Sequence, residues 1–312
     1  MKIFRVAGLQ RETVICILVG CVSLVSVSSS AADLEVFEEE NRSRVFEHLM
    51  DRVARRWEQR RQAVEASLES VDALKARQRR LRRRYAELLG SFPRKTPLKA
   101  EVTGKIDGKG YRIEKVVYES LPDHHVTANV YIPETGEAPY RGVIVACGHS
   151  ANGKAYDDYQ KVSALLAKNG MVALCVDPIG QGERHQKPAA PRHGTTTHTL
   201  LNMGARLVGR SVVWHEQWDL VRSIDYLLSR PEVNSEKPVG MTGTSGGGTQ
   251  TTFAMALDER ICPAAPSCYV MRRPDKFRAS GPADGCQHLP GEGKAGIDHI
   301  DYAVMRAPKP TA

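Results

Sequence analysis

The spacing of hydrophobic residues divides the chain into three stretches. Residues 14–27 are apolar with small residues, residues 33 to about 90 are charged with apolar positions at steps of three and four, and the rest carries short apolar runs. Steps of three and four place apolar side chains on one face of a helix, whereas short runs rich in β-branched residues are typical of strands. The pattern therefore predicts a helical arm followed by an α/β domain.

The predicted arm covers residues 33–95 and ends its last helix near Gly90. A coiled-coil dimer would use its apolar stripe, but Arg60, Ser67 and Gln78 interrupt the seam. We therefore favour one or two helices that pack on the chain's own domain, and the oligomeric state stays open. The stripe consists of Phe46, Met50, Val53, Trp57, Val64, Leu68, Val71, Leu74, Leu81, Tyr85 and Leu88.

The remaining residues, 96–312, carry a pattern in which strands and helices alternate. Strands are expected at residues 112–120, 126–132, 142–147, 171–176, 239–242 and 264–270. Helices are expected at residues 159–169, 211–229 and 249–257. Continuous apolar strands separated by helices indicate a mostly parallel sheet covered by flanking helices.

The apolar run at residues 14–27 indicates a targeting segment. It follows a basic start that includes Lys2, and it ends in small residues before Ala32. This is the pattern of a secretory signal, and the run is too short for a good membrane span. We expect residues 1–32 to be removed near Ala32, which places the protein outside the cell or in the periplasm. A lipoprotein anchor at Cys21 is the alternative, although the apolar run continues past Cys21.

The net charge says little about partners, because its excess is local. The 312 residues have a formal charge of +8 and a pI of about 9.1, with ordinary hydrophobic and charged fractions of 41% and 26%. Between residues 77 and 95 the single acid is Glu87, whereas the bases are Arg77, Arg79, Arg80, Arg82, Arg83, Arg84, Arg94 and Lys95. Such a run is typical of a solvated helix face, so no nucleic-acid partner is expected.

The cysteines give no sign of a metal site. Five remain after the predicted signal: Cys147, Cys175, Cys262, Cys268 and Cys286. No pair has the local spacing of zinc ligands, so no metal is expected. Cys147 and Cys175 end apolar strands and are expected to be buried thiols. Export would permit one disulfide among the other three, and its pairing stays open.

The strongest chemical signal is the G-x-S-x-G pattern at residues 243–247. A buried strand leads into it and a helix leads out of it. This context predicts a nucleophile elbow, in which Ser245 sits on a tight turn with its hydroxyl exposed. The amino end of the following helix favours negative charge that develops at the serine. The alternative is a glycine-rich turn with a structural role alone.

Two further loops follow predicted parallel strands. In a fold with this elbow, the loop at residues 148–150 supplies one backbone N–H to an oxyanion hole, and the residue after the serine supplies the other. We expect these donors to be His149 N–H and Gly246 N–H, with the His149 side chain in a positioning role. Asp177 and Gln181 follow the next strand, where they either shape a substrate pocket or hold a structural turn.

Together these segments resemble secreted bacterial α/β-hydrolases of the acetyl xylan esterase type, over roughly residues 95–310. They are also similar, more distantly, to prolyl-oligopeptidase-like peptidases. The resemblance is carried by residues 130–133, 148–149, 177–182 and 243–248. It implies an α/β-hydrolase fold and a Ser-Asp-His triad without metal or organic cofactor. It also implies hydrolysis of an ester, such as acetylated xylan, through an acyl-enzyme on Ser245, with Gly246 as an oxyanion donor.

The end of the chain departs from this pattern. The acid and the histidine of the triad follow the serine on later strands and loops, and we expect them beyond residue 312, in a fold truncated at its C-terminus. The activity of this exact chain is therefore in doubt. After Ser245 the histidines are His288 and His299, and the nearby acids are Glu292, Asp298 and Asp301. His299 is a substitute base in one interpretation; we favour a structural histidine.

Two rival functions stay open at this point. The first is a peptidase of the same fold, which usually carries an N-terminal propeller that a short charged arm cannot build. The second is an inactive hydrolase remnant that acts as a binding or scaffold protein through its arm. Turnover of a small acetyl ester separates the esterase from both rivals.

Overall fold

The protein is described by a computed structural model in which residues 43–187, 194–280 and 284–312 are placed. The predicted signal, residues 1–32, lies outside these described residues. The chain forms two compact units, residues 1–49 and 50–312. Of the first unit, the structure describes only the beginning of helix α1. Every helix within the described ranges is too short or too polar to span a membrane.

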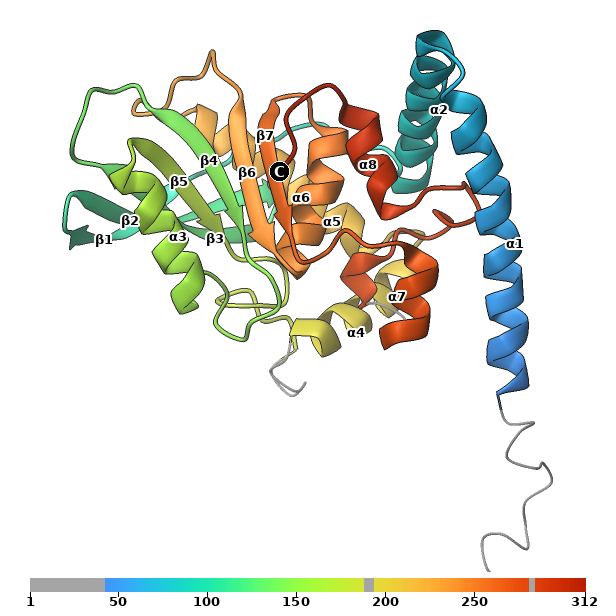
Figure 1. Cartoon of the computed structure of the whole chain (residues 1–312). Helices are drawn as coiled ribbons and strands as arrows, with labels where there is room; N and C mark the ends of the chain where they lie inside the picture. Colours follow the sequence, from blue (N-terminus) through green and yellow to red (C-terminus); the bar gives the residue numbers. More distant parts are fainter. Residues whose placement is uncertain (1–42, 188–193, 281–283) are drawn as a thin grey trace, which may run out of the picture. The chain divides into compact units, whose positions relative to one another are not determined.

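A seven-stranded mixed sheet forms the centre of the second unit, in the order β1-β2-β3-β5-β4-β6-β7 (Figure 1). Strands β5, β4, β6 and β7 run parallel, whereas β1, β2 and β3 are antiparallel to their neighbours. The strands are β1 (Glu101–Gly108), β2 (Tyr111–Leu121), β3 (His124–Pro133), β4 (Arg141–Ala146), β5 (Met171–Val176), β6 (Val239–Thr244) and β7 (Ile261–Ser267). The parallel half carries the predicted elbow.

Helices cover both faces of this sheet. Neighbouring residues of β4 point to opposite sides, so Ile144 joins the core cluster of α5 and α6 while Val145 joins the smaller cluster beside α3. The helices of this domain are α3 (Asp157–Lys168), α4 (Gly194–Leu207), α5 (Val212–Leu228), α6 (Gly246–Leu257), α7 (Arg273–Ser280) and α8 (His299–Arg306). The predicted α/β architecture is therefore confirmed.

Every strand and helix predicted for residues 96–312 is present, with ends shifted by a few residues. Helix α6 begins earlier than predicted, at Gly246, and β7 also begins earlier, at Ile261. The sequence pattern did not reveal β1, α4, α7 or α8. β1 is mostly exposed at the edge of the sheet, so it lacks the apolar signal of its neighbours.

The predicted arm forms helices α1 (Arg44–Ser67) and α2 (Val71–Leu89). Helix α2 contributes to the main core: Tyr85 is 1% exposed, and its ring packs against Phe253 of α6 and Tyr302 of α8. The Tyr85 hydroxyl donates to the Phe253 carbonyl at 3.1 Å. The apolar stripe of α2 is therefore used within the chain, which is the packing that we favoured over a coiled coil.

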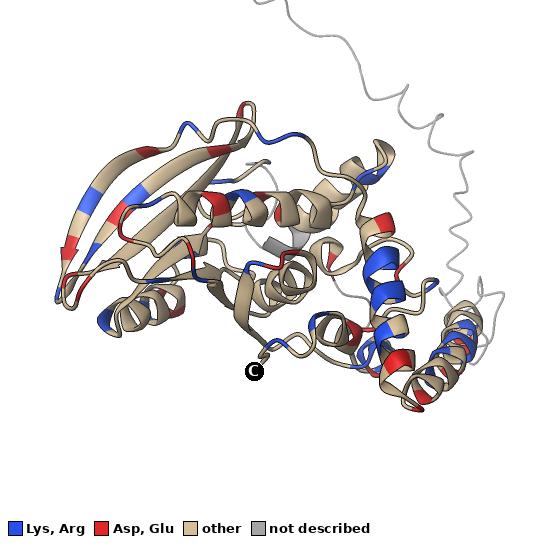
Figure 2. Ribbon diagram, turned by 90° about the horizontal axis from the view of Figure 1, so that it is seen from above, with Lys and Arg blue, Asp and Glu red and all other residues tan. Residues whose placement is uncertain are grey.

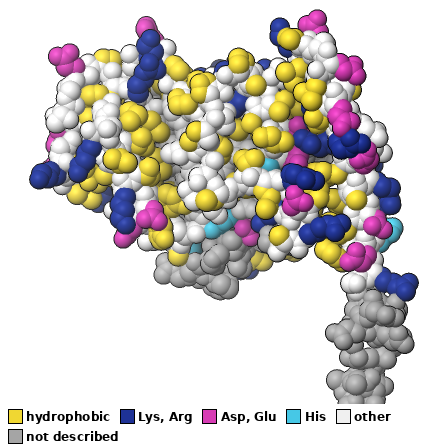
Figure 3. Space-filling model, in the orientation of Figure 1, with side chains coloured by type: hydrophobic (Ala, Val, Ile, Leu, Met, Phe, Trp, Pro, Cys, Tyr) yellow, Lys and Arg dark blue, Asp and Glu magenta, His cyan; other side chains and the backbone are white. Residues whose placement is uncertain are grey.

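The basic run of α2 is largely the solvated face that the sequence predicted. Lys and Arg recur along the arm helices (Figure 2), and charged side chains of both signs gather over them (Figure 3). Arg83, for example, pairs with Glu87 across an exposed turn. Arg77 is the exception among these bases, because its side chain is only 4% exposed.

Asp301 links both arm helices to α8. Its carboxylate is buried and accepts from Arg60 Nε of α1 at 2.9 Å and from Arg77 Nη2 of α2 at 2.7 Å. The same carboxylate accepts from Asp298 N–H and so completes the capping box of α8. One buried acid therefore pairs with two arginines and caps the start of a helix.

Replacing Asp301 by alanine is expected to lower the free energy of unfolding by about 3–5 kcal/mol, because it leaves buried arginines without a counter-charge. The control is Glu65→Ala, which removes an exposed partner of Arg61 and is expected to cost about 1 kcal/mol or less. Urea denaturation of both variants measures the difference. Equal losses in the two variants would contradict the anchoring role of Asp301.

Candidate functional site

Ser245 lies on a tight turn between β6 and α6, as the sequence predicted. Its backbone has φ 58° and ψ −115°, a conformation that is strained for a residue with a side chain. The turn is held by the Ser245 N–H, which donates to the Ser267 carbonyl of β7 at 2.9 Å. The residue itself is partly exposed. The strained backbone conformation therefore belongs to the residue that the motif predicts to be the nucleophile.

The glycines of the motif are required by close backbone contacts. A Cβ at Gly247 would lie 2.0 Å from the Ala146 carbonyl oxygen of β4, and one at Gly243 would lie 2.6 Å from the same oxygen. A Cβ at Gly248 would lie 2.2 Å from the Ser267 carbonyl oxygen. These neighbours are backbone atoms of adjoining strands, so a side chain could enter only by displacing the sheet.

The loop at residues 148–150 lies against this turn. A Cβ at Gly148 would be 2.2 Å from the Thr244 carbonyl oxygen and 3.3 Å from Gly246 N. Gly148 is fixed from both sides, since its N–H donates to the Tyr159 hydroxyl at 2.6 Å and its carbonyl accepts from Gln181 Nε2 at 2.7 Å. Gly246 opens α6, so its N–H has no partner within the helix. The two segments expected to supply oxyanion donors are therefore adjacent.

Asp177 and Gln181 form hydrogen bonds to the segment at residues 148–154. Both side chains are fully buried. Asp177 accepts from Lys154 N–H at 2.7 Å and from the Thr127 hydroxyl at 2.7 Å, and it also pairs with the Lys154 ammonium. Gln181 holds Gly148, as described above. The geometry matches the structural-turn alternative, because neither side chain reaches a surface that a substrate could contact.

The imidazole of His149 lies directly over the elbow. A Cβ at Gly246 would be 3.0 Å from both Cε1 and Nε2 of this ring. Its Nε2 is 3.1 Å from Cys286 Sγ, and its Nδ1 is 3.6 Å from Asp284 Oδ2. Both ring nitrogens therefore already have partners, which matches the positioning role expected for this side chain. The contacts of Cys286 and Asp284 with His149 could not be predicted, because both residues lie far from it along the chain.

His299 is a buried structural residue in the described geometry. It is 2% exposed, and its ring stacks on Tyr269 with centroids 4.2 Å apart. Its Nδ1 accepts from Met271 N–H at 3.3 Å. Burial, assisted by the charge of Arg273, lowers the pKa of His299 to about 3. These contacts agree with the interpretation that we favoured over a substitute base.

The His299 pKa predicts a loss of stability in acid. Below pH 6.5 the unfolded chain binds a proton that folded His299 accepts only near pH 3, so this residue contributes a slope of about 1.4 kcal/mol per pH unit between these values. His299→Gln is expected to flatten the pH dependence of the free energy of unfolding, measured in urea. The control His125→Gln removes an exposed histidine and should retain the wild-type slope. An unchanged slope in His299→Gln would contradict the assignment.

The described cysteines are all free thiols. Cys147 and Cys175 are buried, as predicted, with their sulfurs 3.6 Å apart. The disulfide that the sequence left open among Cys262, Cys268 and Cys286 is not formed in the structure. Burial raises the pKa of the Cys286 thiol well above its usual range.

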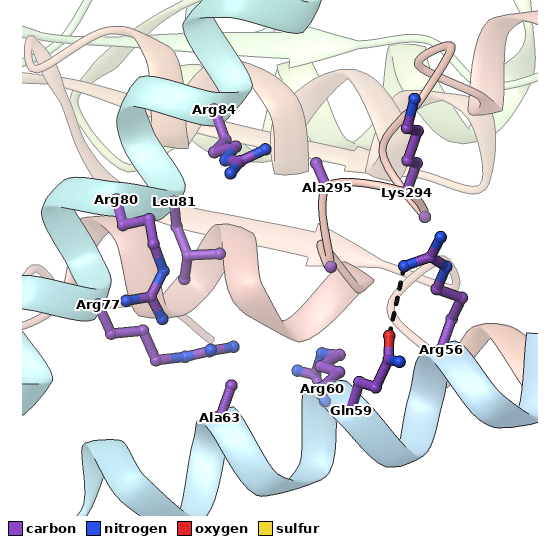
Figure 4. Close-up of a pocket in the computed structure, with 12 residues that line it drawn as sticks. Arg56, Gln59, Arg60, Ala63, Arg77, Arg80, Leu81, Arg84, Lys294 and Ala295 are labelled. Carbon is purple, nitrogen blue, oxygen red and sulfur yellow. Dashed lines mark hydrogen bonds between the residues drawn. The ribbon is translucent and has the colours of Figure 1, made fainter.

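A basic cavity of about 180 Å³ lies apart from the elbow, between α1, α2 and the loop at residues 293–296. Figure 4 shows its cationic side chains around one hollow; they are Arg56, Arg60, Arg77, Arg80, Arg84 and Lys294. Asp301 pairs with two of them. Neither Ser245 nor the loop at residues 148–150 contributes to its described wall, so this hollow is not the site of the predicted chemistry.

Comparison with known proteins supports the esterase interpretation. The sequence model of a family described as acetyl xylan esterase (AXE1) matches residues 96–271. None of the curated proteins compared matches the chain.

Several solved structures are similar. A protein assigned as an acetyl xylan esterase from Bacteroides fragilis NCTC 9343 has a TM-score of 0.65 and 16% identity, with 77% of this chain and 67% of that one covered. Methylesterase BT1017 has a TM-score of 0.57 and 24% identity, over 78% of this chain and 51% of that protein, about half its length. A glucuronoyl esterase from Solibacter usitatus has a TM-score of 0.50 and 17% identity, over 78% and 74% of the two chains.

At these identities the solved structures establish the fold, which is the predicted α/β-hydrolase arrangement. The family match is a stronger statement, because it covers more than half of the chain and includes the elbow and both supporting loops. The chain belongs to the acetyl xylan esterase (AXE1) family.

Proposed function

We propose that this protein hydrolyses carboxylic esters of a carbohydrate with Ser245 as the nucleophile. One observation carries the proposal: Ser245 sits on a strained strand-to-helix turn, and the Gly246 amide lies beside the loop of His149. A serine esterase needs this pairing of an exposed hydroxyl with donors for an oxyanion.

In the proposed reaction, Ser245 Oγ attacks the acyl carbon of the ester while a base accepts the hydroxyl proton. The carbonyl oxygen becomes negatively charged and accepts from Gly246 N–H and His149 N–H, with further stabilisation from the amino end of α6. Collapse of this intermediate breaks the bond to the alcohol oxygen, which leaves with a proton and forms the acyl-enzyme. Water then attacks the acyl carbon and releases the acid and free Ser245.

His149 and His299, the two histidines considered above for this serine, already have partners. Both ring nitrogens of His149 have other partners, and His299 is buried against Tyr269. The acid and histidine expected after residue 312 therefore stay a prediction. A comparison of residues 33–312 with a chain extended at the C-terminus tests it, and robust turnover by the shorter protein would place the base within residues 33–312.

The proposed substrate is a short acyl group on a carbohydrate such as xylan, as the family description suggests. A catalytically competent chain is expected to hydrolyse acetyl esters faster than octanoyl esters, and to release acetate from acetylated xylan. Initial rates on a matched pair of esters measure the preference. A preference for the long chain would contradict the acyl assignment, and cleavage of peptides alone would favour the peptidase alternative.

We also propose that the protein is exported after removal of residues 1–32, which lie outside the described residues. The basic start, the apolar run and the small residues before Ala32 support this proposal. Mass spectrometry of the mature protein should find a start near Ala32 or Asp33. An intact Met1 would contradict export, and a lipid on Cys21 would replace it with the lipoprotein alternative.

A further inference from the structure

Three potential metal ligands converge beside the elbow. They are His149 after β4, His198 of α4 and Cys286 of the short 3-10 helix η4 (Gly285–Gln287). One ligand atom from each residue lies within 4.8 Å of the other two. The closest pair is His149 Nε2 and Cys286 Sγ at 3.1 Å, and the two imidazole rings stand at 61° with centroids 5.3 Å apart.

His198 presents a nitrogen that has no protein partner. The residue is 1% exposed, and its Nε2 lies 2.6 Å from the Ile179 carbonyl oxygen, to which it donates. Its Nδ1 is buried without a hydrogen-bond partner. Because the neutral ring carries its proton on Nε2 for this bond, Nδ1 holds a lone pair. A histidine that donates one ring N–H to a backbone carbonyl and keeps the other nitrogen bare is typical of a metal ligand.

Glu216 of α5 lies near this histidine, and burial raises the pKa of its carboxyl group well above the usual range. Its carboxyl group is 2% exposed, and Oε1 lies 3.9 Å from His198 Nε2. Neither carboxyl oxygen has a hydrogen-bond partner. A buried carboxyl group without a partner is costly. The partner that orients the His198 ring is the Ile179 carbonyl, because Glu216 Oε1 lies beyond hydrogen-bond distance of Nε2.

We propose that His149, His198 and Cys286 bind one Zn²⁺ ion. Two imidazole nitrogens and one thiolate form a donor set that Zn²⁺ prefers, with bond lengths of roughly 2.0–2.3 Å. Ligand atoms on such an ion are roughly 3.3–3.6 Å apart, so the widest separation in this cluster must close by about 1 Å. Binding releases the Cys286 proton to solvent, and a water molecule completes the tetrahedron.

The ion would join three segments that are distant in the sequence. It would tie the loop of His149 to α4 and to η4, and so hold the His149 backbone where the oxyanion donor is proposed. Local spacing could not predict such a site, because each segment contributes a single ligand. Metal binding does not depend on the role of Ser245, so the two proposals can fail separately.

The test is metal binding by the full chain, with elemental analysis for zinc and the absorption spectrum after Co²⁺ substitution. We expect one metal ion per chain and the intense thiolate-to-cobalt absorption of a tetrahedral site. Cys286→Ser and His198→Gln should both lose the bound metal, whereas the control Cys268→Ser, an exposed cysteine outside the cluster, should retain it. Ser245→Ala should bind zinc as the wild type does.

Absence of zinc from the folded wild-type chain after incubation with the ion would overturn the proposal. So would a cobalt spectrum that lacks the thiolate band or that survives Cys286→Ser. Circular dichroism accompanies each variant. If Cys286→Ser does not fold, the wild-type stoichiometry and the thiolate band decide the question, because no other described cysteine lies in the cluster.

Discussion

Ser245→Ala is expected to reduce acetyl-ester turnover of a catalytically competent chain by roughly 10⁴-fold or more. The substitution removes the oxygen that forms the acyl-enzyme and leaves both backbone donors in place. Alanine carries the same Cβ into the strained turn, so the circular dichroism spectrum should not change. The matched control is Ser235→Ala, an exposed serine on another turn, which should keep full activity.

Residual turnover by Ser245→Ala within tenfold of the parent would show that another group is the nucleophile. Residues 33–312 give a second measurement. If no group among these residues accepts the serine proton, their turnover should be near background and should not fall further in Ser245→Ala. Ser245-dependent turnover by this shorter chain would instead point to a base among its own histidines, and His149→Ala and His299→Ala would then distinguish the candidates.

Gly247→Ala is expected to lower the free energy of unfolding by about 3 kcal/mol or more and to abolish activity. The new Cβ would meet the Ala146 carbonyl oxygen at 2.0 Å, and relief requires movement of β4 or α6. The control is Gly204→Ala on α4, where no heavy atom lies within 4 Å of the added Cβ. That variant should gain about 0.5–1 kcal/mol from the better helix propensity of alanine.

Urea denaturation of the two glycine variants provides the comparison, since the chemical change is identical. If Gly247→Ala were as stable as Gly204→Ala, the close approach of α6 to β4 would not exist in solution. If Gly247→Ala kept its stability but lost its activity, the glycine would be needed to position Ser245 and not to keep the sheet packed.

The parts of the fold that the sequence predicted are those in which local chemistry decides the structure. Strands β4 and β5 are continuous apolar runs, and their burial on both faces leaves no competing helical pattern. The elbow is also local, because its glycines, its strand and its helix are consecutive. The role of Tyr85 in the core followed from the stripe of α2, which is a periodic signal.

The parts that could not be predicted depend on contacts between distant segments. His149, His198 and Cys286 come together only when β4, α4 and η4 are packed. Asp177 follows a strand at the edge of the sheet where ligands are expected, yet its carboxylate forms an ion pair with the Lys154 ammonium. Sequence position can place a side chain at an edge, but burial decides whether it faces a ligand or the protein.

Strand β7 has a consequence for self-association. The N–H groups of successive residues in a strand point alternately to its two sides. Ala264 and Pro266 are two residues apart, so both face the outer side of β7, where Pro266 has no N–H to donate. Ala264 is already engaged, since its N–H donates to Pro310 and its carbonyl accepts from Ala312 N–H. Residues 310–312 therefore already pair with this margin at Ala264, and Pro266 withholds the next donor from a strand of another molecule. The missing donor of Pro266 therefore weakens edge-to-edge pairing of two copies along β7.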